Sequence, residues 1–187
     1  MRVLGISGSL RRGSHNTSLL RAAATALPPA ASLDLYRGLA EIPPYSEDAE
    51  ALEEPAAAAR LKQALRAADA VLFATPEYNH SIPGQLKNAI DWVSRPVAGN
   101  PLAGKPVAVV GASTGTFGAV WAQADLRRVL GALRARVVDR ELPVPYAAEA
   151  FAADGSLRDR ETAAELAALL ADLAAEASAA ELTPAAA

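Results

Sequence analysis

The sequence predicts an α/β fold in which helices cover both faces of a parallel sheet. Residues 70–74 and 105–111 are apolar on both faces of a strand, which is typical of a buried strand in a parallel sheet. Segments with apolar residues at helical spacing separate each predicted strand from the next. Five strand and helix units in this order predict a doubly wound parallel sheet.

The element boundaries follow from periodicity and from proline. The predicted strands lie at residues 3–6, 32–36, 70–74, 105–111 and within 136–144. The buried stripes of the five helices contain Leu19, Leu20, Ala23 and Leu27, then Leu61, Leu65 and Ala68, then Leu86, Ile90 and Val93, then Leu126, Val129, Leu130 and Leu133, and finally Leu166, Leu169, Leu170 and Leu173. The first helix begins at Asn16 or Thr17, and Pro55 suits a first helical position. Residues 37–54 are polar and rich in proline, which predicts a surface loop.

Length and composition exclude several classes of protein. A chain of 187 residues is one ordinary domain, expected over residues 1–180 with a frayed tail at 181–187. A net charge of −3 and a pI near 5.4 argue against nucleic-acid binding, and no apolar run reaches the length of a membrane span. The absence of cysteine removes disulfides, thiolate metal sites and a cysteine nucleophile. The first residues carry no signal-peptide pattern, so we expect a cytoplasmic protein.

The loop after the first strand has the composition of a phosphate site. Gly5 and Gly8 permit tight turns, and hydroxyl and guanidinium groups follow them at Ser9, Arg11, Arg12, Ser14 and Thr17. The free N–H groups of the next helix point at the same place. The loop lacks the Gly-Lys-Ser/Thr of nucleoside triphosphatases and the Gly-x-Gly of dinucleotide-binding proteins. The alternatives are a solvated polar turn and, for Arg12, a solvated surface charge.

Two further loops follow the third and fourth strands, and they therefore end at the same edge of the sheet. In residues 75–84 two prolines bracket an aromatic residue and several hydrogen-bonding side chains. Residues 76–79 offer a planar heterocycle an apolar face and a polar backbone edge. Residues 111–118 are rich in glycine, so their backbone can approach the opposite edge of the ring.

Three motifs show a resemblance to a known family. They are GSLRRGSHNTSL at residues 8–19, PEYNHSIPGQLKNAIDW at 76–92, and GASTGTFGA followed by LRRVLGALRARV between 111 and 137. With these motifs the chain resembles the NAD(P)H-dependent FMN reductases, flavodoxin-like proteins whose relatives include quinone, chromate and azo-dye reductases. The resemblance implies a flavodoxin-like, five-stranded parallel sheet of order 2-1-3-4-5 with helices on both faces.

The resemblance also assigns site residues. It implies that the FMN phosphate is held by Ser9, Arg11, Ser14, His15, Asn16 and Thr17. It implies that the isoalloxazine is lined by Pro76, Glu77, Tyr78 and Asn79, and is closed on its far side by Ser113 and Gly115. Two positions depart from close relatives, because His80 stands where another aromatic residue is frequent and Thr114 where proline is often found. Both bear on the choice of electron acceptor.

The function implied is hydride transfer from NADH or NADPH to N5 of FMN, then to a second, small-molecule acceptor in a ping-pong cycle. The acceptor would be a quinone, chromate, an azo compound or free flavin, and the flavin would carry the chemistry, so that no catalytic side chain is expected. A flavodoxin-like electron carrier is an alternative that the modest net charge disfavours. A non-catalytic nucleotide-binding regulator of the same fold is another.

Other polar and aromatic residues receive simpler interpretations. His15 and His80 are not at metal-ligand spacing, and no metal is expected. Lys87, Asp91 and Arg95 at i, i+4 spacing predict a surface ion-pair ladder. Trp92 and Trp121 suit either the core or a subunit interface. We expect a homodimer or homotetramer, as the resemblance implies, whose interface contains Tyr78, Ile82 and Trp92 and lies near the flavin.

Overall fold

A computed structural model describes residues 1–182 and shows one parallel sheet with strands of different lengths. Its strands are β1 (Arg2–Ser7), β2 (Ser32–Tyr36), β3 (Ala70–Thr75), β4 (Pro106–Ala112), β5 (Arg136–Val137) and β6 (Pro143–Val144). The order is β2-β1-β3-β4-β5, and every pairing is parallel. The predicted strand order 2-1-3-4-5 is confirmed. The carboxyl ends of β1, β3 and β4 therefore lie at one edge of the sheet.

The last strand differs from the single strand expected within residues 136–144. Two short strands, β5 and β6, both pair with β4, and the chain leaves the sheet between them. Side chains of the helix α5 satisfy this backbone instead. Arg127 Nη1 donates to the carbonyls of Val138 and Arg140, and Gln123 Oε1 accepts from the N–H of Leu142. The interruption thus leaves these groups hydrogen-bonded.

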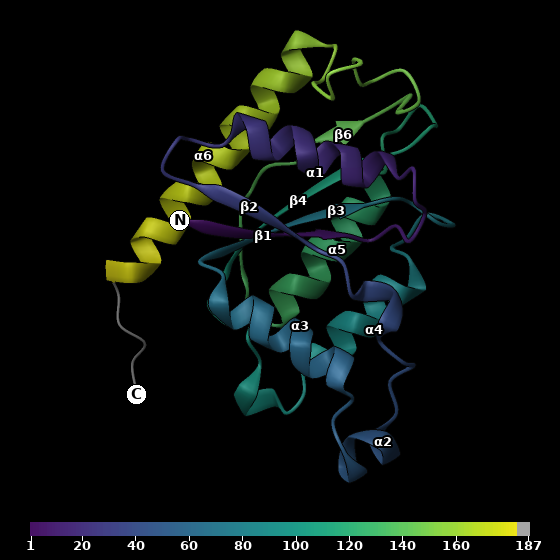
Figure 1. Cartoon of the computed structure of the whole chain (residues 1–187), viewed down its shortest axis with the longest axis vertical. Coiled ribbons are helices and arrows are strands. Elements are labelled where there is room, and N and C mark those ends of the chain that lie inside the picture. The colour runs from purple at the N-terminus through teal and green to yellow at the C-terminus, as the bar shows by residue number, and fades with distance from the viewer. Residues whose placement is uncertain (183–187) are drawn as a thin grey trace.

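Helices cover both faces of the sheet, as Figure 1 shows. On one face lie α1 (His15–Ala26) and α6 (Arg160–Leu182), and on the other lie α3 (Ala56–Ala67), α4 (Gly84–Val93) and α5 (Val120–Ala132). Every residue of β3 and of β4 is buried. Alternate residues of these strands enter two separate cores, with Phe73 in the core under α3 to α5 and Leu72 in the core under α1 and α6. This is the doubly wound arrangement that the sequence predicts.

The expected loop at residues 37–54 contains two short helices. These are the 3₁₀ helix η1 (Leu39–Glu41) and the α-helix α2 (Glu47–Leu52), and a further 3₁₀ helix, η2 (Val97–Gly99), follows α4. Ser46 caps α2 by accepting a hydrogen bond from the N–H of Ala49. Acidic residues fill the first turn, where they complement the helix dipole. The loop interpretation was therefore wrong for this part of the segment.

The structure separates the two tryptophans. Trp92 is 1% exposed and donates from Nε1 to the carbonyl of Pro43 at 2.8 Å, whereas Trp121 is 40% exposed. Trp92 is a core residue, and its expected place in a subunit interface was wrong. The expected ion-pair ladder is present only as Lys87 and Asp91, because Arg95 pairs with Glu50 of α2.

Two remaining features concern the ends of the chain and the helices. Helix α6 continues through residues 181–182, and the rest of the expected frayed tail, residues 183–187, lies outside the described residues. Among the helices described, none is both long enough and apolar enough to cross a membrane.

Candidate functional site

The loop that joins β1 to α1 is held in place by hydrogen bonds to both elements. Ser14 Oγ accepts from the N–H of Thr17 at 3.2 Å and caps α1. Thr17 Oγ1 donates to Ser7 Oγ at 3.1 Å, and the N–H of Gly8 donates to the carbonyl of Ala74 at 2.8 Å. The first turn of α1, which carries unpaired N–H groups, is thereby fixed beside the carboxyl ends of β1 and β3.

A cavity of about 340 Å³ opens beside this loop and is rich in arginine. Its polar lining residues are Ser7, Ser9, Arg11, Arg12, Thr17, Arg21, Tyr36 and Arg37. No carboxylate of the described chain lines it. None of its four arginines forms an ion pair within residues 1–179. Guanidinium groups bind phosphate through charge-assisted hydrogen bonds, so the cavity favours a phosphorylated ligand.

The six residues assigned to the phosphate do not all reach this cavity. Ser9, Arg11 and Thr17 line it. Ser14 and Asn16 are buried and do not line it, and both side chains have partners inside the protein. Asn16 exchanges two hydrogen bonds of 2.9 Å with the backbone of Ala112 at the end of β4. Their side chains therefore order the loop.

His15, the sixth of these residues, lies partly buried at the start of α1. Its ring is parallel to that of Phe151, with centroids 6.5 Å apart. Burial lowers the pKa of the His15 imidazole, and the charge of Arg11 lowers it further. An anion bound nearby would favour the protonated imidazole and would raise this pKa.

Arg21 and Arg37 were not among the residues identified from the sequence. Arg21 lies one helical turn after Thr17, so both side chains face the cavity. Arg37 directly follows β2, the neighbour of β1 in the sheet. The i, i+4 spacing from Thr17 is the signal that could have identified Arg21. Arg12, interpreted as a solvated charge, also lines the cavity.

The loop after β3 contains a tight turn that is fastened to α5. Tyr78 and Ser81 exchange backbone hydrogen bonds of 3.0 and 3.1 Å. The two residues between them, Asn79 and His80, have φ of 53° and 59°, which is the conformation of a two-residue hairpin turn. Ser81 Oγ donates to Asp125 Oδ2 of α5 at 2.6 Å. This bond, followed by the one from Arg128, lowers the pKa of Asp125.

Glu77 makes a second connection between this loop and α5. Glu77 Oε2 accepts from the N–H groups of Trp121 and Ala122 at 3.1 and 3.2 Å. These are free donors in the first turn of the helix, where a carboxylate is favourable. The Glu77 carboxylate therefore positions the loop. The backbone of Pro76 and Glu77 remains at the edge of the sheet.

The loop after β4 is exposed from residue 114 to 117 and is supported from behind. Ser113 Oγ accepts from the N–H of Gly115 at 3.1 Å. The segment after β6 holds the same two residues, because the N–H of Tyr146 donates to the Gly115 carbonyl and that of Ala147 to the Ser113 carbonyl. Ser113 and Gly115 thus lie at the edge where Pro76 and Asn79 are found.

Aromatic side chains gather between these two loops. Phe117 and Trp121 meet edge to face at 4.8 Å, and His80 meets Trp121 in the same way at 4.7 Å. Phe117 and Tyr78 are more than half exposed. We call Tyr78, His80, Phe117 and Trp121 the aromatic patch. It is an apolar surface beside the expected flavin edge.

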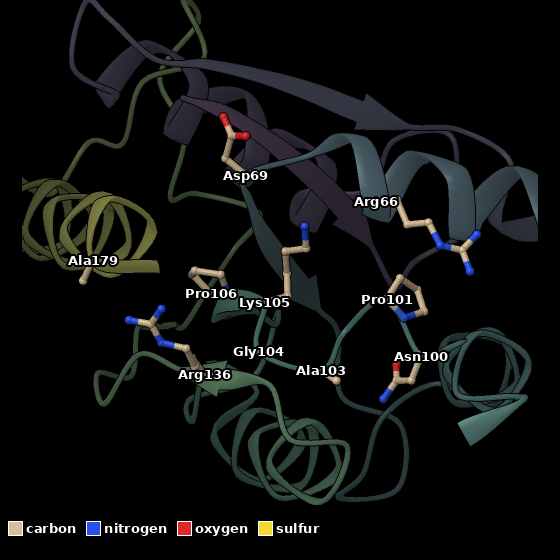
Figure 2. A pocket seen from close by; sticks show the side chains of 10 residues that line it. All are labelled: Arg66, Asp69, Asn100, Pro101, Ala103, Gly104, Lys105, Pro106, Arg136 and Ala179. Carbon is tan, nitrogen blue, oxygen red and sulfur yellow. The ribbon is translucent and has the colours of Figure 1, made fainter. Parts of the chain in front are cut away.

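A larger cavity lies at the opposite edge of the sheet. It has a volume of about 720 Å³ and is lined by residues that precede or begin β3, β4 and β5, among them Asp69, Lys105 and Arg136 (Figure 2). Ligands of doubly wound sheets bind at the carboxyl ends of the strands. The three loops therefore define the principal site, and the larger cavity is a separate feature.

The fold and the three loops together define a flavodoxin-like protein with a site for a phosphorylated, planar cofactor. The donor set fits the phosphate of FMN, because hydroxyls, arginines and a helix N-terminus surround a cavity without a carboxylate. The supported loops after β3 and β4 lie at the edge where a planar ring attached to that phosphate would extend.

Comparisons with known proteins identify the family. Residues 1–149 match the model of the NADPH-dependent FMN reductase family. An NAD(P)H-dependent FMN reductase of Pseudomonas aeruginosa is 49% identical over 160 residues, which are 85% of each chain. A quinone reductase of Escherichia coli K12 is 40% identical over 141 residues, which are 75% of this chain and 74% of the relative.

A solved structure supports the same relationship. FerB of Paracoccus denitrificans, a flavoenzyme NAD(P)H:acceptor oxidoreductase, superposes with a TM-score of 0.84 at 37% identity, over 95% of this chain and 97% of that one. The chain belongs to the NADPH-dependent FMN reductase family. It is an NAD(P)H-dependent flavin oxidoreductase with FMN as cofactor.

Proposed function

We propose that the protein transfers electrons from NAD(P)H through bound FMN to a quinone-type acceptor in a ping-pong cycle. The observation that carries the proposal is the cavity with four arginines and no carboxylate beside the first turn of α1. The quinone reductase among the relatives supports the class of acceptor. The need for NAD(P)H assigns the reaction to the cytoplasm.

In this proposal the chain binds the phosphate and orients the ring. Ser9, Arg11 and Thr17 hold the FMN phosphate from the cavity, and Arg12, Arg21 and Arg37 add positive charge around it. Ser14 and Asn16 keep the loop in the conformation that places these donors. His15 lies beside Arg11 and adds a donor when it is protonated.

The ring system would lie between the other two loops. Pro76 to Asn79 contribute their backbone and the Tyr78 ring on one side, and Ser113 with Gly115 closes the other. FMN, when bound, supplies the N5 atom that accepts a hydride and passes electrons on. The chain supplies no acid or base in this step. It holds the ring still, because the loops are bonded to α5 and to the segment after β6.

We also propose that the protein is a homodimer or homotetramer whose interface contains the aromatic patch. Trp121 and Phe117 expose 40% and 62% of their surfaces, and exposed aromatic clusters of this kind are typical of interfaces. Their position next to the loop after β3 would place the flavin edge near the partner subunit. Water would then have restricted access to the reacting atoms.

Steady-state kinetics on the FMN-loaded protein tests the proposed cycle. Initial rates are measured at several concentrations of NADPH, and then of NADH, against a soluble benzoquinone. Parallel double-reciprocal lines are expected, because one crevice admits the two substrates in turn. Intersecting lines would contradict the ping-pong cycle. Yellow protein that fails to oxidise either nicotinamide would contradict the enzymatic proposal and favour an electron carrier or a regulator.

A further inference from the structure

The cavity at the amino edge of the sheet contains a lysine that forms no ion pair with residues 1–179. Lys105 directly precedes β4 and stands in the middle of the cavity, with Asp69, Arg66 and Arg136 around it (Figure 2). This edge is opposite the flavin loops, because all the strands are parallel. The proposed FMN site therefore does not use this cavity.

Lys105 differs from the other lysines of the chain. The sequence contains three lysines. Lys62 pairs with Glu54 and Lys87 pairs with Asp91. Among residues 1–179, Lys105 has no carboxylate partner, and its Nζ donates to one backbone carbonyl, that of Ala68, at 2.5 Å. An ammonium group can donate three hydrogen bonds, so donors remain for a ligand.

The surrounding groups offset the charge of Lys105 only in part. Asp69 is the carboxylate of the lining, and its Oδ2 already accepts from the N–H of Arg2 at 2.6 Å. Arg66 and Arg136 also line the cavity. Arg136 pairs with Glu176, which balances its charge, and Arg66 donates to the Gly99 carbonyl. Burial lowers the pKa of Lys105, and Asp69 offsets this only in part.

The C-terminal end of α3 explains the contact of Lys105 with Ala68, but it does not balance the whole charge of the ammonium group. Ala68 is the C-cap of α3, and a cation near a helix C-terminus is favourable. The helix end carries only roughly half a unit of negative charge, which is less than the charge of an ammonium group. A structural role for Lys105 therefore leaves net positive charge in the cavity, because, among the described residues, Asp69 is its one carboxylate beside Lys105, Arg66 and Arg136, and Arg136 pairs with Glu176.

The size and the walls of the cavity indicate the kind of ligand. Its volume of about 720 Å³ lies within the range of small-molecule sites, roughly 300–1,000 Å³. Pro101, Ala103 and Pro106 form an apolar wall. The backbone of residues 100–104 is fixed by two hydrogen bonds. Asn100 Nδ2 donates to the Leu133 carbonyl, and the N–H of Gly104 donates to the Arg134 carbonyl. A bare inorganic ion would leave this wall uncovered.

We propose that this cavity binds a small organic anion, whose carboxylate or phosphate group pairs with Lys105 while its apolar body covers the wall formed by Pro101 and Pro106. Arg66 lies at the side of the cavity and increases the local positive potential, whereas Arg136 is paired with Glu176. The site is separate from the FMN site, so its occupancy does not depend on the proposed reaction.

NMR of the lysine side chains tests this proposal on the wild-type protein. The protein carries ¹³C at lysine Cε and is saturated with FMN, so that the arginine-lined cavity is filled. Phenyl phosphate and benzoate, each with an aromatic body, are titrated at constant ionic strength. The signal of Lys105 should shift to saturation while those of Lys62 and Lys87 stay in place, and the head group that binds more tightly identifies the preferred anion.

A matched pair of variants completes the experiment. Lys105→Met should weaken binding of the probe about tenfold or more, as expected for the loss of a charge-assisted hydrogen bond. Lys87→Met should leave it unchanged, because Lys87 lies in a surface ion pair. The proposal is overturned if neither probe moves the Lys105 signal, or if all three lysines shift alike, as a general ionic effect would produce. Both outcomes are read from the wild type, even if a variant does not fold.

Discussion

Arg11 is assigned to the proposed phosphate site by the family resemblance, and it lines the arginine-rich cavity. We expect Arg11→Ala to weaken FMN binding by about 1.5–3 kcal/mol, the range for a hydrogen bond to a charged group. The fold should be unaffected, because the side chain is exposed and forms no ion pair. Quenching of FMN fluorescence by apo-protein measures the affinity.

The matched control for this variant is Arg60→Ala, which removes an exposed arginine that pairs with Glu41 outside the cavity. Its FMN affinity should equal that of the wild type. Equal losses in the two variants would show a general effect of charge and would remove Arg11 from the site.

His15 provides a second test at the level of one residue. Its pKa in the free protein lies below the ordinary value of 6.5, because of burial and Arg11. A phosphate dianion nearby should raise this pKa, since it favours the charged imidazolium. NMR titration of the His15 ring, with and without FMN, measures the change. Riboflavin lacks the phosphate and should leave the pKa where it was. A pKa that FMN does not raise would place the phosphate elsewhere.

Some residues have contacts that could not be predicted from the sequence. Trp92 and Trp121 lie on consecutive helices of the chain, α4 and α5, yet Trp121 is 40% exposed and Trp92 is buried with a hydrogen-bond partner, the carbonyl of Pro43. That partner comes from a distant segment. Arg37 reaches the phosphate cavity only because β2 pairs with β1. Contacts of this kind depend on tertiary structure and leave no local pattern.

At the scale of elements, the loop after β4 depends on a glycine. Gly118 has φ of +58°, and a Cβ there would lie 2.6 Å from the backbone nitrogen of Val144. We expect Gly118→Ala to lower the free energy of unfolding by more than about 1–2 kcal/mol, from the left-handed conformation and the clash. Gly131→Ala is the control within α5, where a Cβ meets no atom. It should raise the stability by about 0.5–1 kcal/mol.

Urea denaturation of both variants measures these changes. A Gly118→Ala protein as stable as the wild type would show that β6 can move away from this loop. It would then contradict the inference that the segment after β6 supports the loop rigidly.

The regular elements were predictable because their signals are local. Apolar residues at helical spacing predicted the five helices that cover the sheet. Segments that are apolar on both faces predicted the buried strands β3 and β4. Helix α2 was missed because it is short and buries no residue, so it has no apolar stripe. The division of the last strand into β5 and β6 was also missed. It depends on Arg127 and Gln123 of α5, which replace the hydrogen bonds of the sheet.

At the scale of the whole molecule, the aromatic patch predicts association. Trp121→Glu should lower the mass in solution, because it places a carboxylate in the proposed interface, where an unpaired charge is unfavourable. The flavin should also be retained less firmly. Light scattering combined with gel filtration measures the mass, and absorbance reports the bound flavin.

Leu52→Glu is the control, since Leu52 is exposed on α2, away from the patch. It should leave the assembly intact. A wild-type protein that is monomeric and fully active at assay concentrations would contradict the proposed oligomer. Trp92→Glu is unsuitable for this purpose, because Trp92 is buried in the core.

The strand order and the three loops bring residues from the first, second and third quarters of the chain to one edge of the sheet. The motifs in those loops were sufficient to identify the family, because each motif follows a strand whose position the doubly wound fold fixes. The cavity around Lys105 has no motif. Most of its residues lie in the segment 100–106, which leads into β4, and the others come singly from helices and from the amino ends of strands.

Equilibrium titration of apo-protein with FMN and with riboflavin tests the proposed site most directly. The arginine-lined cavity predicts one FMN per chain. It also predicts that riboflavin binds at least about a hundredfold more weakly, since it lacks the phosphate that makes two or more charge-assisted hydrogen bonds. Equal affinities for the two flavins would contradict a phosphate site between β1 and α1.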